Sequence, residues 1–147
     1  MKQELVRDWM TAPVIHITPE TTLPEAHQLM AENNVRRLPV VGDNGRLVGI
    51  LTRGDVRGAE PSQATSLSVW ELNYLLSNLC VDELMTKNPV VIQEEATIGE
   101  AARMMLDYRI SGLPVINRFG KLVGIITESD IFRMVVCHQW SKEEAPA

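Results

Sequence analysis

The most constraining feature of this sequence is an internal repeat that covers most of the chain. The stretch Gly49-Ile50-Leu51-Thr52-Arg53-Gly54-Asp55 returns 75 positions later as Gly124-Ile125-Ile126-Thr127-Glu128-Ser129-Asp130. When Met10 is laid on Met85 without gaps, roughly 18 residues are identical up to the end of these stretches, against about three expected by chance. The sequence therefore predicts one fold written twice.

The repeated stretch also has chemical meaning. An apolar run that ends in Thr and is followed by polar residues indicates a buried strand leading into a helix. A helix start offers free backbone N–H groups and a partial positive charge, so Thr52 and Thr127 are candidates for binding phosphate. Asp55 and Asp130 repel phosphate, but their acceptor oxygens match the two neighbouring hydroxyls of a ribose. The alternative is that Thr-x-x-Asp is a capping box with a purely structural role.

Each copy has the order of a β-α-β-β-α unit. Short β-branched runs at residues 14–17 and 90–92 predict first strands. Capping boxes at Thr22-x-x-Glu25 and Thr97-x-x-Glu100 precede apolar residues at helical spacing, so each predicts an amphipathic helix. Leu-Pro-Val then opens an antiparallel hairpin with Gly in its turn, which ends at Thr-x-x-Asp. The predicted class is α+β, of α/β type, with small sheets packed by helices.

The repeat also sets the expected boundaries. We expect repeat 1 at residues 1–57, a connecting loop and inserted helix at 58–80, repeat 2 at 81–140, and a flexible tail at 141–147. The inserted helix, predicted over 66–79, begins at the cap Ser68 and contains Trp70 and several leucines. Its apolar surface fits packing on its own chain, but it also fits an interface with a partner.

Composition narrows the function classes. The 147 residues have a net charge of −5, 45% hydrophobic and 22% charged residues, which is typical of a folded soluble domain. No run of about 18 apolar residues could span a membrane, and the start lacks a signal-peptide core, so we expect a cytoplasmic protein. The charge argues against nucleic acid as a partner. With three histidines, no nucleophile and base pair, and no metal-ligand spacing, the sequence indicates neither an enzyme nor a catalytic cofactor.

The twofold order of Met-Thr, Leu-Pro-Val and Gly-Ile-(Leu/Ile)-Thr-x-x-Asp resembles the cystathionine-β-synthase (CBS) domain, and the pair resembles a Bateman module. The resemblance covers nearly the whole chain. It implies two units that pack through their sheets with pseudo-twofold symmetry, clefts that bind AMP, ADP, ATP or S-adenosylmethionine, and a homodimer. It also implies that Asp55 and Asp130 bind ribose. The full set of expected ligand-binding residues is Thr52, Arg53, Asp55, Thr127, Asp130, Arg36, Arg37, Leu38, Pro39, Ser111, Gly112, Leu113, Pro114, Ile17, Thr18 and Ile92.

The two copies differ in charge near the expected site. Repeat 1 has Arg36-Arg37 and Arg53 where repeat 2 has Ser111-Gly112 and Glu128. Because an Arg fork binds phosphate oxygens in a bidentate manner, we expect these arginines to hold most of the phosphate and the clefts to be unequal. The alternative is that they are ordinary solvated side chains.

Two function hypotheses follow. The first is a stand-alone regulatory sensor, a homodimer that binds an adenine nucleotide and signals by conformational change to an unknown regulated protein. The second is a constitutive dimeric interaction module with vestigial clefts, in which the Trp70 helix makes the contact. Dimerisation is expected because the helices carry more apolar surface than one small sheet covers. The residues concerned are Leu29, Met30, Met104, Met105, Val135 and Val136.

Overall fold

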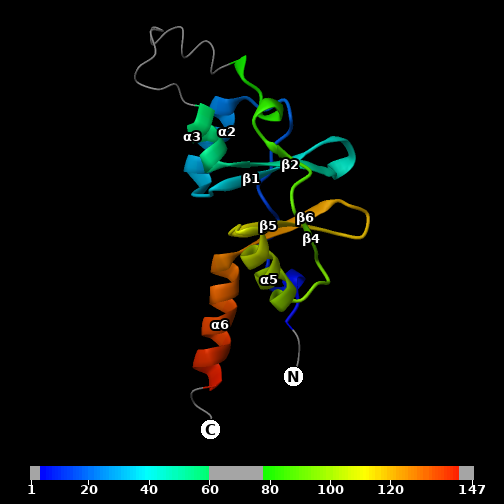
Figure 1. Cartoon of the computed structure of the whole chain (residues 1–147), viewed down its shortest axis with the longest axis vertical. Coiled ribbons are helices and arrows are strands. Elements are labelled where there is room, and N and C mark those ends of the chain that lie inside the picture. Colours follow the sequence, from blue (N-terminus) through cyan, green and yellow to red (C-terminus); the bar gives the residue numbers. More distant parts are fainter. Residues whose placement is uncertain (1–3, 60–77, 143–147) are drawn as a thin grey trace. The chain divides into compact units, whose positions relative to one another are not determined.

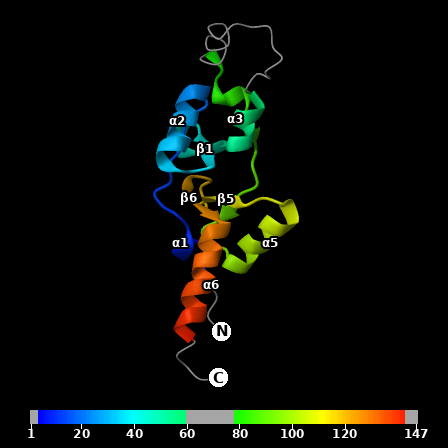
Figure 2. The ribbon, with the colours of Figure 1, turned by 90° about the vertical axis from the view of Figure 1, so that its left-hand side faces the viewer.

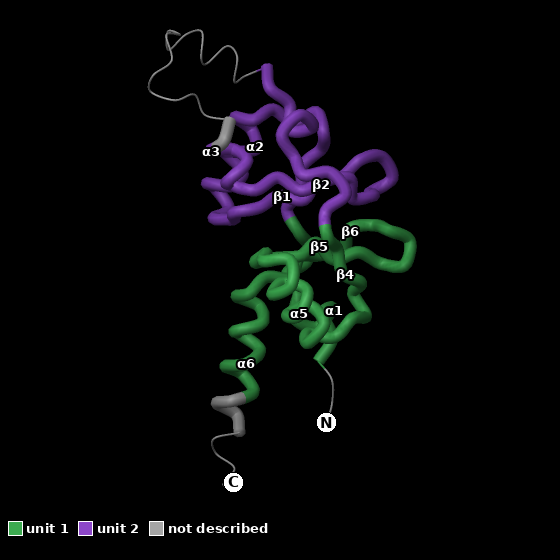
Figure 3. The backbone as a smooth tube through the Cα atoms, viewed as in Figure 1, with its two compact units in different colours: residues 1–14, 90–147 green, residues 15–89 purple. Residues whose placement is uncertain are grey.

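The chain forms two compact units in a computed structural model that describes residues 4–59 and 78–142. Unit 1 contains residues 1–14 and 90–147, and unit 2 contains residues 15–89 (Figure 3). Helices and strands alternate in both units, so the predicted α+β class is confirmed (Figure 1). In these ranges no helix is both long enough and apolar enough to cross a membrane.

Unit 2 is built on a sheet in the order β1-β2-β3. The strands β1 and β2 form the predicted antiparallel hairpin, with Pro39 opposite Ile50. Helices α2 and α3 lie side by side on the same side of this hairpin (Figures 1 and 2). The elements are α2 (Leu23–Asn33), β1 (Arg37–Val41), the turn η1 (Asp43–Gly45), β2 (Leu47–Thr52), α3 (Arg53–Ala59), η2 (Val81–Glu83) and β3 (Thr86–Lys87).

Unit 1 repeats this plan with a sheet in the order β4-β5-β6. The hairpin β5-β6 has Pro114 opposite Ile125, the same register as in unit 2. Helices α5 and α6 contact each other and the hairpin. The elements are α1 (Val6–Trp9), β4 (Ile92–Gln93), α5 (Ile98–Tyr108), β5 (Gly112–Ile116), β6 (Leu122–Thr127) and α6 (Glu128–Lys142).

The local signals in the sequence place the first helix of each repeat. Thr22 caps α2 in a complete capping box with Glu25, and the Thr97 hydroxyl accepts from the Glu100 N–H at 3.1 Å at the start of α5. Both helices end in a left-handed residue, at Asn34 and Arg109, which stops the helix in the manner of a Schellman-type end. The capping signals therefore predicted both helix starts correctly.

Each unit has its own hydrophobic core between its hairpin and its helices. The hairpin strands β1 and β5 are buried over four successive residues each, which explains their continuous apolar sequence. Leu38 and Leu51 are fully buried in unit 2, and Leu113 and Ile126 occupy the matching positions of unit 1. The residue directly before each Thr-x-x-Asp stretch, Leu51 or Ile126, is thus anchored in the core of its unit.

The leading segment of each sequence repeat pairs with the sheet of the other repeat. Thr11 exchanges two backbone hydrogen bonds with Ile125, at 2.8 and 3.1 Å, within unit 1. The matching segment after repeat 1, Thr86–Lys87, forms β3 on β2 of unit 2. As a result, the leading segment of each repeat belongs to the compact unit of the other repeat; we call this the exchange of leading segments. The expected boundaries at 57 and 81 therefore do not coincide with the edges of the units.

This exchange corrects the predicted first strands. Residues 14–17 form no strand, and only Ile17 makes a parallel bridge to Val40. In the second copy the strand is Ile92–Gln93, shorter than and shifted from the predicted 90–92. The β-branched residues favour a strand at 14–17, but the two-residue antiparallel pairing at the edge of unit 2 is made on β2 by Thr86–Lys87, next to Met85.

The Met-Thr motif explains the first glycine of each Gly-Ile-x-Thr stretch. A Cβ built on Gly49 would lie 2.5 Å from Met85 Sδ and 2.9 Å from the Thr86 carbonyl oxygen. A Cβ on Gly124 would lie 2.6 Å from Met10 Sδ and 3.0 Å from the Thr11 carbonyl oxygen. Glycine therefore lets the exchanged segment lie directly on the neighbouring strand.

Two sequence predictions concern residues beyond this description. Most of the helix expected over 66–79, including Trp70, lies outside the described residues. The expected tail at 141–147 is also largely outside them, although α6 runs to Lys142. Both remain predictions.

Candidate ligand-binding site

In unit 2 the three segments expected to bind a ligand are neighbours in the sheet. Arg37 is the register partner of Thr52, and the Arg53 N–H donates to the Arg36 carbonyl at 2.8 Å. On the other side of β1, the Ile17 N–H donates to the Pro39 carbonyl at 3.0 Å. The hairpin geometry therefore gathers residues that are up to 36 positions apart in the sequence, from Ile17 to Arg53.

Unit 1 gathers the matching segments in the same way. Gly112 is the register partner of Thr127, and the Glu128 N–H donates to the Ser111 carbonyl at 3.0 Å. Ile92 pairs in parallel with Val115. Each unit thus carries one set of the predicted residues, built on the same scaffold.

The carboxylate of Asp55 closes a capping box at the start of α3. The Thr52 N–H donates to Asp55 Oδ2 at 2.8 Å, and the Asp55 N–H donates to Thr52 Oγ1 at 3.2 Å. This is the structural role that the sequence left open as an alternative. It uses one carboxylate oxygen, and no partner of Asp55 Oδ1 is recorded within residues 4–59 and 78–142.

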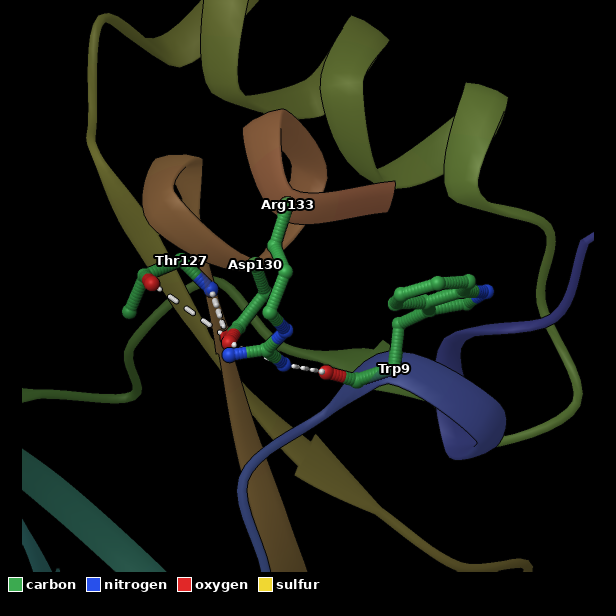
Figure 4. A network of polar contacts seen from close by, with 4 residues as sticks. All are labelled: Trp9, Thr127, Asp130 and Arg133. Carbon is green, nitrogen blue, oxygen red and sulfur yellow. Dashed lines mark hydrogen bonds and ion pairs between the residues drawn. The ribbon is translucent and has the colours of Figure 1, made fainter. Parts of the chain in front are cut away.

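The carboxylate of Asp130 is engaged on both oxygens (Figure 4). Oδ2 accepts from the Thr127 N–H at 2.9 Å and from the Thr127 hydroxyl at 3.2 Å. Oδ1 accepts from Arg133 Nη2 at 3.0 Å, and the same nitrogen donates to the Trp9 carbonyl at 3.1 Å. The sequence reasoning missed Arg133, although an acid and an Arg at i, i+3 on a helix are a recognisable signal.

Burial separates the remaining predicted residues into two groups. Ile17 and Leu38 belong to the core of unit 2, and Ile92 and Leu113 belong to the core of unit 1, so their side chains are committed to packing. Pro39 and Pro114 are fully buried as well, and Gly112 is buried. Arg36, Arg53 and Thr18 are exposed, while the remaining predicted residues Arg37, Thr52, Ser111 and Thr127 are partly exposed. The exposed residues include Arg36 and Arg53, whose guanidinium groups are suited to a negatively charged ligand.

A basic groove of about 220 Å³ lies between α2 and α3. Arg53 and Arg57 of α3 line it, together with His27 of α2. The apolar part of its lining is Met30, Ala31 and Val56. In unit 1 the positions that match Ala31 and Arg57 are Leu106 and Phe132, which are exposed apolar side chains. The helix faces of the two units therefore differ in charge as the sequence predicted for Arg53 against Glu128.

The described residues hold no cluster of three or more His, Cys, Asp or Glu side chains that could bind a metal ion. Cys80 is partly buried and Cys137 is exposed, and neither forms a disulfide. The polar groups of the candidate site are accordingly carboxylates, hydroxyls, backbone N–H groups and guanidinium groups.

A fold of two matching units, each with a helix, an antiparallel hairpin that ends in Thr-x-x-Asp and a second helix, defines a tandem-repeat module of a recognisable family. The family model of the CBS domain matches residues 6–62 and 81–136. The chain belongs to the CBS domain family, and its two matched segments make it a CBS pair, or Bateman module.

Curated relatives include stand-alone proteins and larger enzymes. A CBS domain-containing protein of Dictyostelium discoideum is 33% identical over 132 residues, which are 90% of this chain and 91% of that protein. An inosine-5'-monophosphate dehydrogenase of Korarchaeum cryptofilum is 37% identical over 119 residues. That match covers 81% of this chain but only 22% of the dehydrogenase.

Two solved structures are similar over nearly the whole chain. CBSX2 in complex with AMP aligns with a TM-score of 0.78 and 30% identity, covering 92% of this chain and 98% of CBSX2. The CBS domain pair of protein MJ0100, in complex with 5'-methylthioadenosine and S-adenosyl-L-methionine, aligns with a TM-score of 0.76 and 28% identity. The second alignment covers 93% of this chain and 99% of the other.

Proposed function

We propose that this protein is a regulatory sensor that binds an adenine nucleotide or a related adenosine ligand and signals to a partner protein. The observation that carries the proposal is the likeness of nearly the whole chain to a CBS pair bound to AMP, at 30% identity. The likeness to a second pair bound to two other adenosine compounds supports the same ligand class. Adenine with its ribose is the chemical group that these ligands share.

The geometry of unit 2 supplies suitable partners for such a ligand. Asp55 Oδ1, which the capping box leaves aside, can accept from a ribose hydroxyl. The exposed Arg36 and Arg53, adjacent through a backbone hydrogen bond, can pair with a phosphate. We propose these residues, with Thr52 and Arg37, as the contacts to ribose and phosphate.

The proposal is one of binding without turnover. A nucleophile or metal-bound water is the usual source of phosphoryl or acyl chemistry, and the candidate site contains a capped carboxylate and arginines instead. Incubating the protein with ATP and separating the products by chromatography tests this point. Sustained release of ADP or AMP would contradict it.

We expect AMP to raise the melting temperature of the protein by several degrees. A ligand at 100 times its dissociation constant adds about 2.7 kcal/mol to the free energy of unfolding. In a domain of this size, such a gain raises the melting temperature by several degrees. Thermal-shift measurements with AMP, ADP, ATP and S-adenosylmethionine check the prediction. GMP is the matched control, because it keeps the ribose and phosphate and changes only the base. If no adenine compound shifts the transition, the constitutive interaction module becomes the better account.

We also propose that the protein forms a homodimer through helices of unit 1. Phe132, Val135 and Val136 are spaced i, i+3 and i+4 on α6, and Phe132 is 64% exposed. Leu106 of α5 is also exposed. The sequence predicts that Met30 and Met105 also contribute apolar surface to dimerisation. This prediction is wrong for these two residues, because both are buried in the cores of their own units.

The dimer prediction is that Phe132→Asp lowers the mass in light scattering from two chains to one at tens of micromolar. A charge placed in an apolar interface costs free energy that a small interface cannot offset. Phe119→Asp is the matched control, because Phe119 is equally exposed, at 61%, but lies in the β5-β6 turn. A monomeric wild type, or a dimer unaffected by Phe132→Asp, would contradict the proposal.

A further inference from the structure

The two aspartates of the repeated stretch are not equally available. Asp130 is 3% exposed, and its Oδ1 is already paired with Arg133 at 3.0 Å. Arg133 is held from a second side, because its Nη2 also donates to the carbonyl of Trp9 at the end of α1 (Figure 4). The side chain of Arg133 therefore occupies the oxygen that a ribose hydroxyl would need.

Among the described residues of unit 2, Asp55 has no such neighbour. Its Oδ2 accepts from the Thr52 N–H, as Asp130 Oδ2 does from Thr127, but no partner of Oδ1 is recorded within the described ranges. The residue that matches Arg133 in the repeat is Gly58, which has no side chain to offer. Asp55 is also only partly buried. The same motif therefore has one closed and one open carboxylate.

We propose that Arg133 keeps Asp130 closed to ligands, so that an adenosine ligand binds first at Asp55 and reaches Asp130 only by displacing Arg133. This inference rests on the proposed function, because it assumes that these carboxylates bind ribose. It differs from the charge argument made from Arg36, Arg37 and Arg53, since it applies to a ligand without phosphate. Arg133 acts through Asp130 and is a competitor of the ligand.

Displacement of Arg133 by a ligand lowers the free energy gained on binding. The ligand must replace a charge-assisted hydrogen bond on a buried carboxylate, which is among the stronger polar contacts. The Arg133 side chain is 56% exposed, so solvent can take over its guanidinium once it leaves. Site closure is thus reversible, and we expect the Asp130 site to be about tenfold weaker than it is without Arg133.

Calorimetric titration with adenosine tests the inference, because adenosine is neutral and has no phosphate to interact with the arginines. In the wild type we expect one tight site per chain, weakened at least about tenfold in Asp55→Ala, and a second site at least about tenfold weaker than the first. Arg133→Gln should strengthen the weaker site about tenfold. Arg103→Gln is the matched control: it removes the same charge from an exposed ion pair with Asp107 on α5 and should change neither site.

The outcomes separate this inference from the proposed function. Two equal sites in the wild type, or a weaker site that Arg133→Gln leaves unchanged or weakens further, would overturn the inference while adenosine binding stands. A wild type that binds no adenosine, with Arg133→Gln also silent, would overturn both. The decisive comparison is therefore between sites within one protein.

A second measurement covers the case in which Arg133→Gln does not fold. The wild type is titrated with adenosine from about 0.05 to about 0.5 M NaCl, because added salt screens the half-exposed ion pair. The ratio of the two dissociation constants should fall severalfold, since among the described residues Asp130 has an ion pair to break and Asp55 does not. A ratio that does not change with salt would overturn the inference.

Discussion

Gly124→Val is expected to lower the free energy of unfolding by about 3 kcal/mol, the upper end of the usual cost of overpacking. The first side-chain carbon alone would lie 2.6 Å from Met10 Sδ and 3.0 Å from the Thr11 carbonyl oxygen. The sign of the effect is informative, because strand propensity alone favours Val over Gly in β6. Thermal or denaturant unfolding measures the change.

Two further variants show whether the exchanged segment is the cause. Gly99→Ala, in the exposed first turn of α5, should be neutral or should stabilise by about 0.5–1 kcal/mol, because a Cβ there has only Thr97 Oγ1 at 3.8 Å as a neighbour. Met10→Ala combined with Gly124→Ala should recover only part of the loss from Gly124→Ala. The Thr11 carbonyl would still be in the way. A fully stable Gly124→Val would show that residues 10–11 do not lie on β6.

Asp55→Ala is expected to weaken adenosine binding at the tighter site by roughly ten- to hundredfold. Hydrogen bonds made by a charged group contribute about 1.5–3 kcal/mol, and the ribose would lose its acceptor. The same substitution removes the hydrogen bond to the Thr52 N–H, so the protein should also lose about 1 kcal/mol of stability. Calorimetry and thermal unfolding on one variant measure both effects.

Asp55→Asn separates the two roles of this carboxylate. The amide oxygen of Asn can still accept from the Thr52 N–H, so the cap and most of the stability should remain. The charge and the second acceptor are lost, so binding should fall about tenfold. Asp107→Ala, at an exposed position on α5, is the control for the change in net charge. Stability lost without any change in binding, in Asp55→Ala, would leave Asp55 with the structural role alone.

The parts of the fold that depend on local signals could be predicted from the sequence. The side-chain caps Thr22 and Thr97 lie three residues from the backbone N–H groups they bind, and both mark true helix starts. The turns before β2 and β6 place Gly45 and Gly120 at positive φ, as their sequences indicated. A duplicated pattern added weight to each of these signals, because an error would have had to occur twice.

The parts that depend on distant contacts could not be predicted in this way. Nothing near Met10 in the sequence indicates that it packs on Gly124, and the β-branched run at 14–17 was the stronger strand signal. The closed state of Asp130 was missed for a related reason. The spacing of Arg133 was visible, but its second contact, the Trp9 carbonyl, comes from a segment at the other end of the chain.

The exchange of leading segments has a consequence for the order in which the protein folds during its synthesis on the ribosome. Unit 2 is continuous, residues 15–89, so all of its residues have been made before the first strand of unit 1 exists. Residues 4–11 are made before unit 2, yet their partners, Ala96 and Ile125 among them, are made after it. Because chains fold from the N-terminus as units become complete, we expect unit 2 to fold while residues 4–11 still wait for unit 1. These residues are thus made before unit 2 but packed after it.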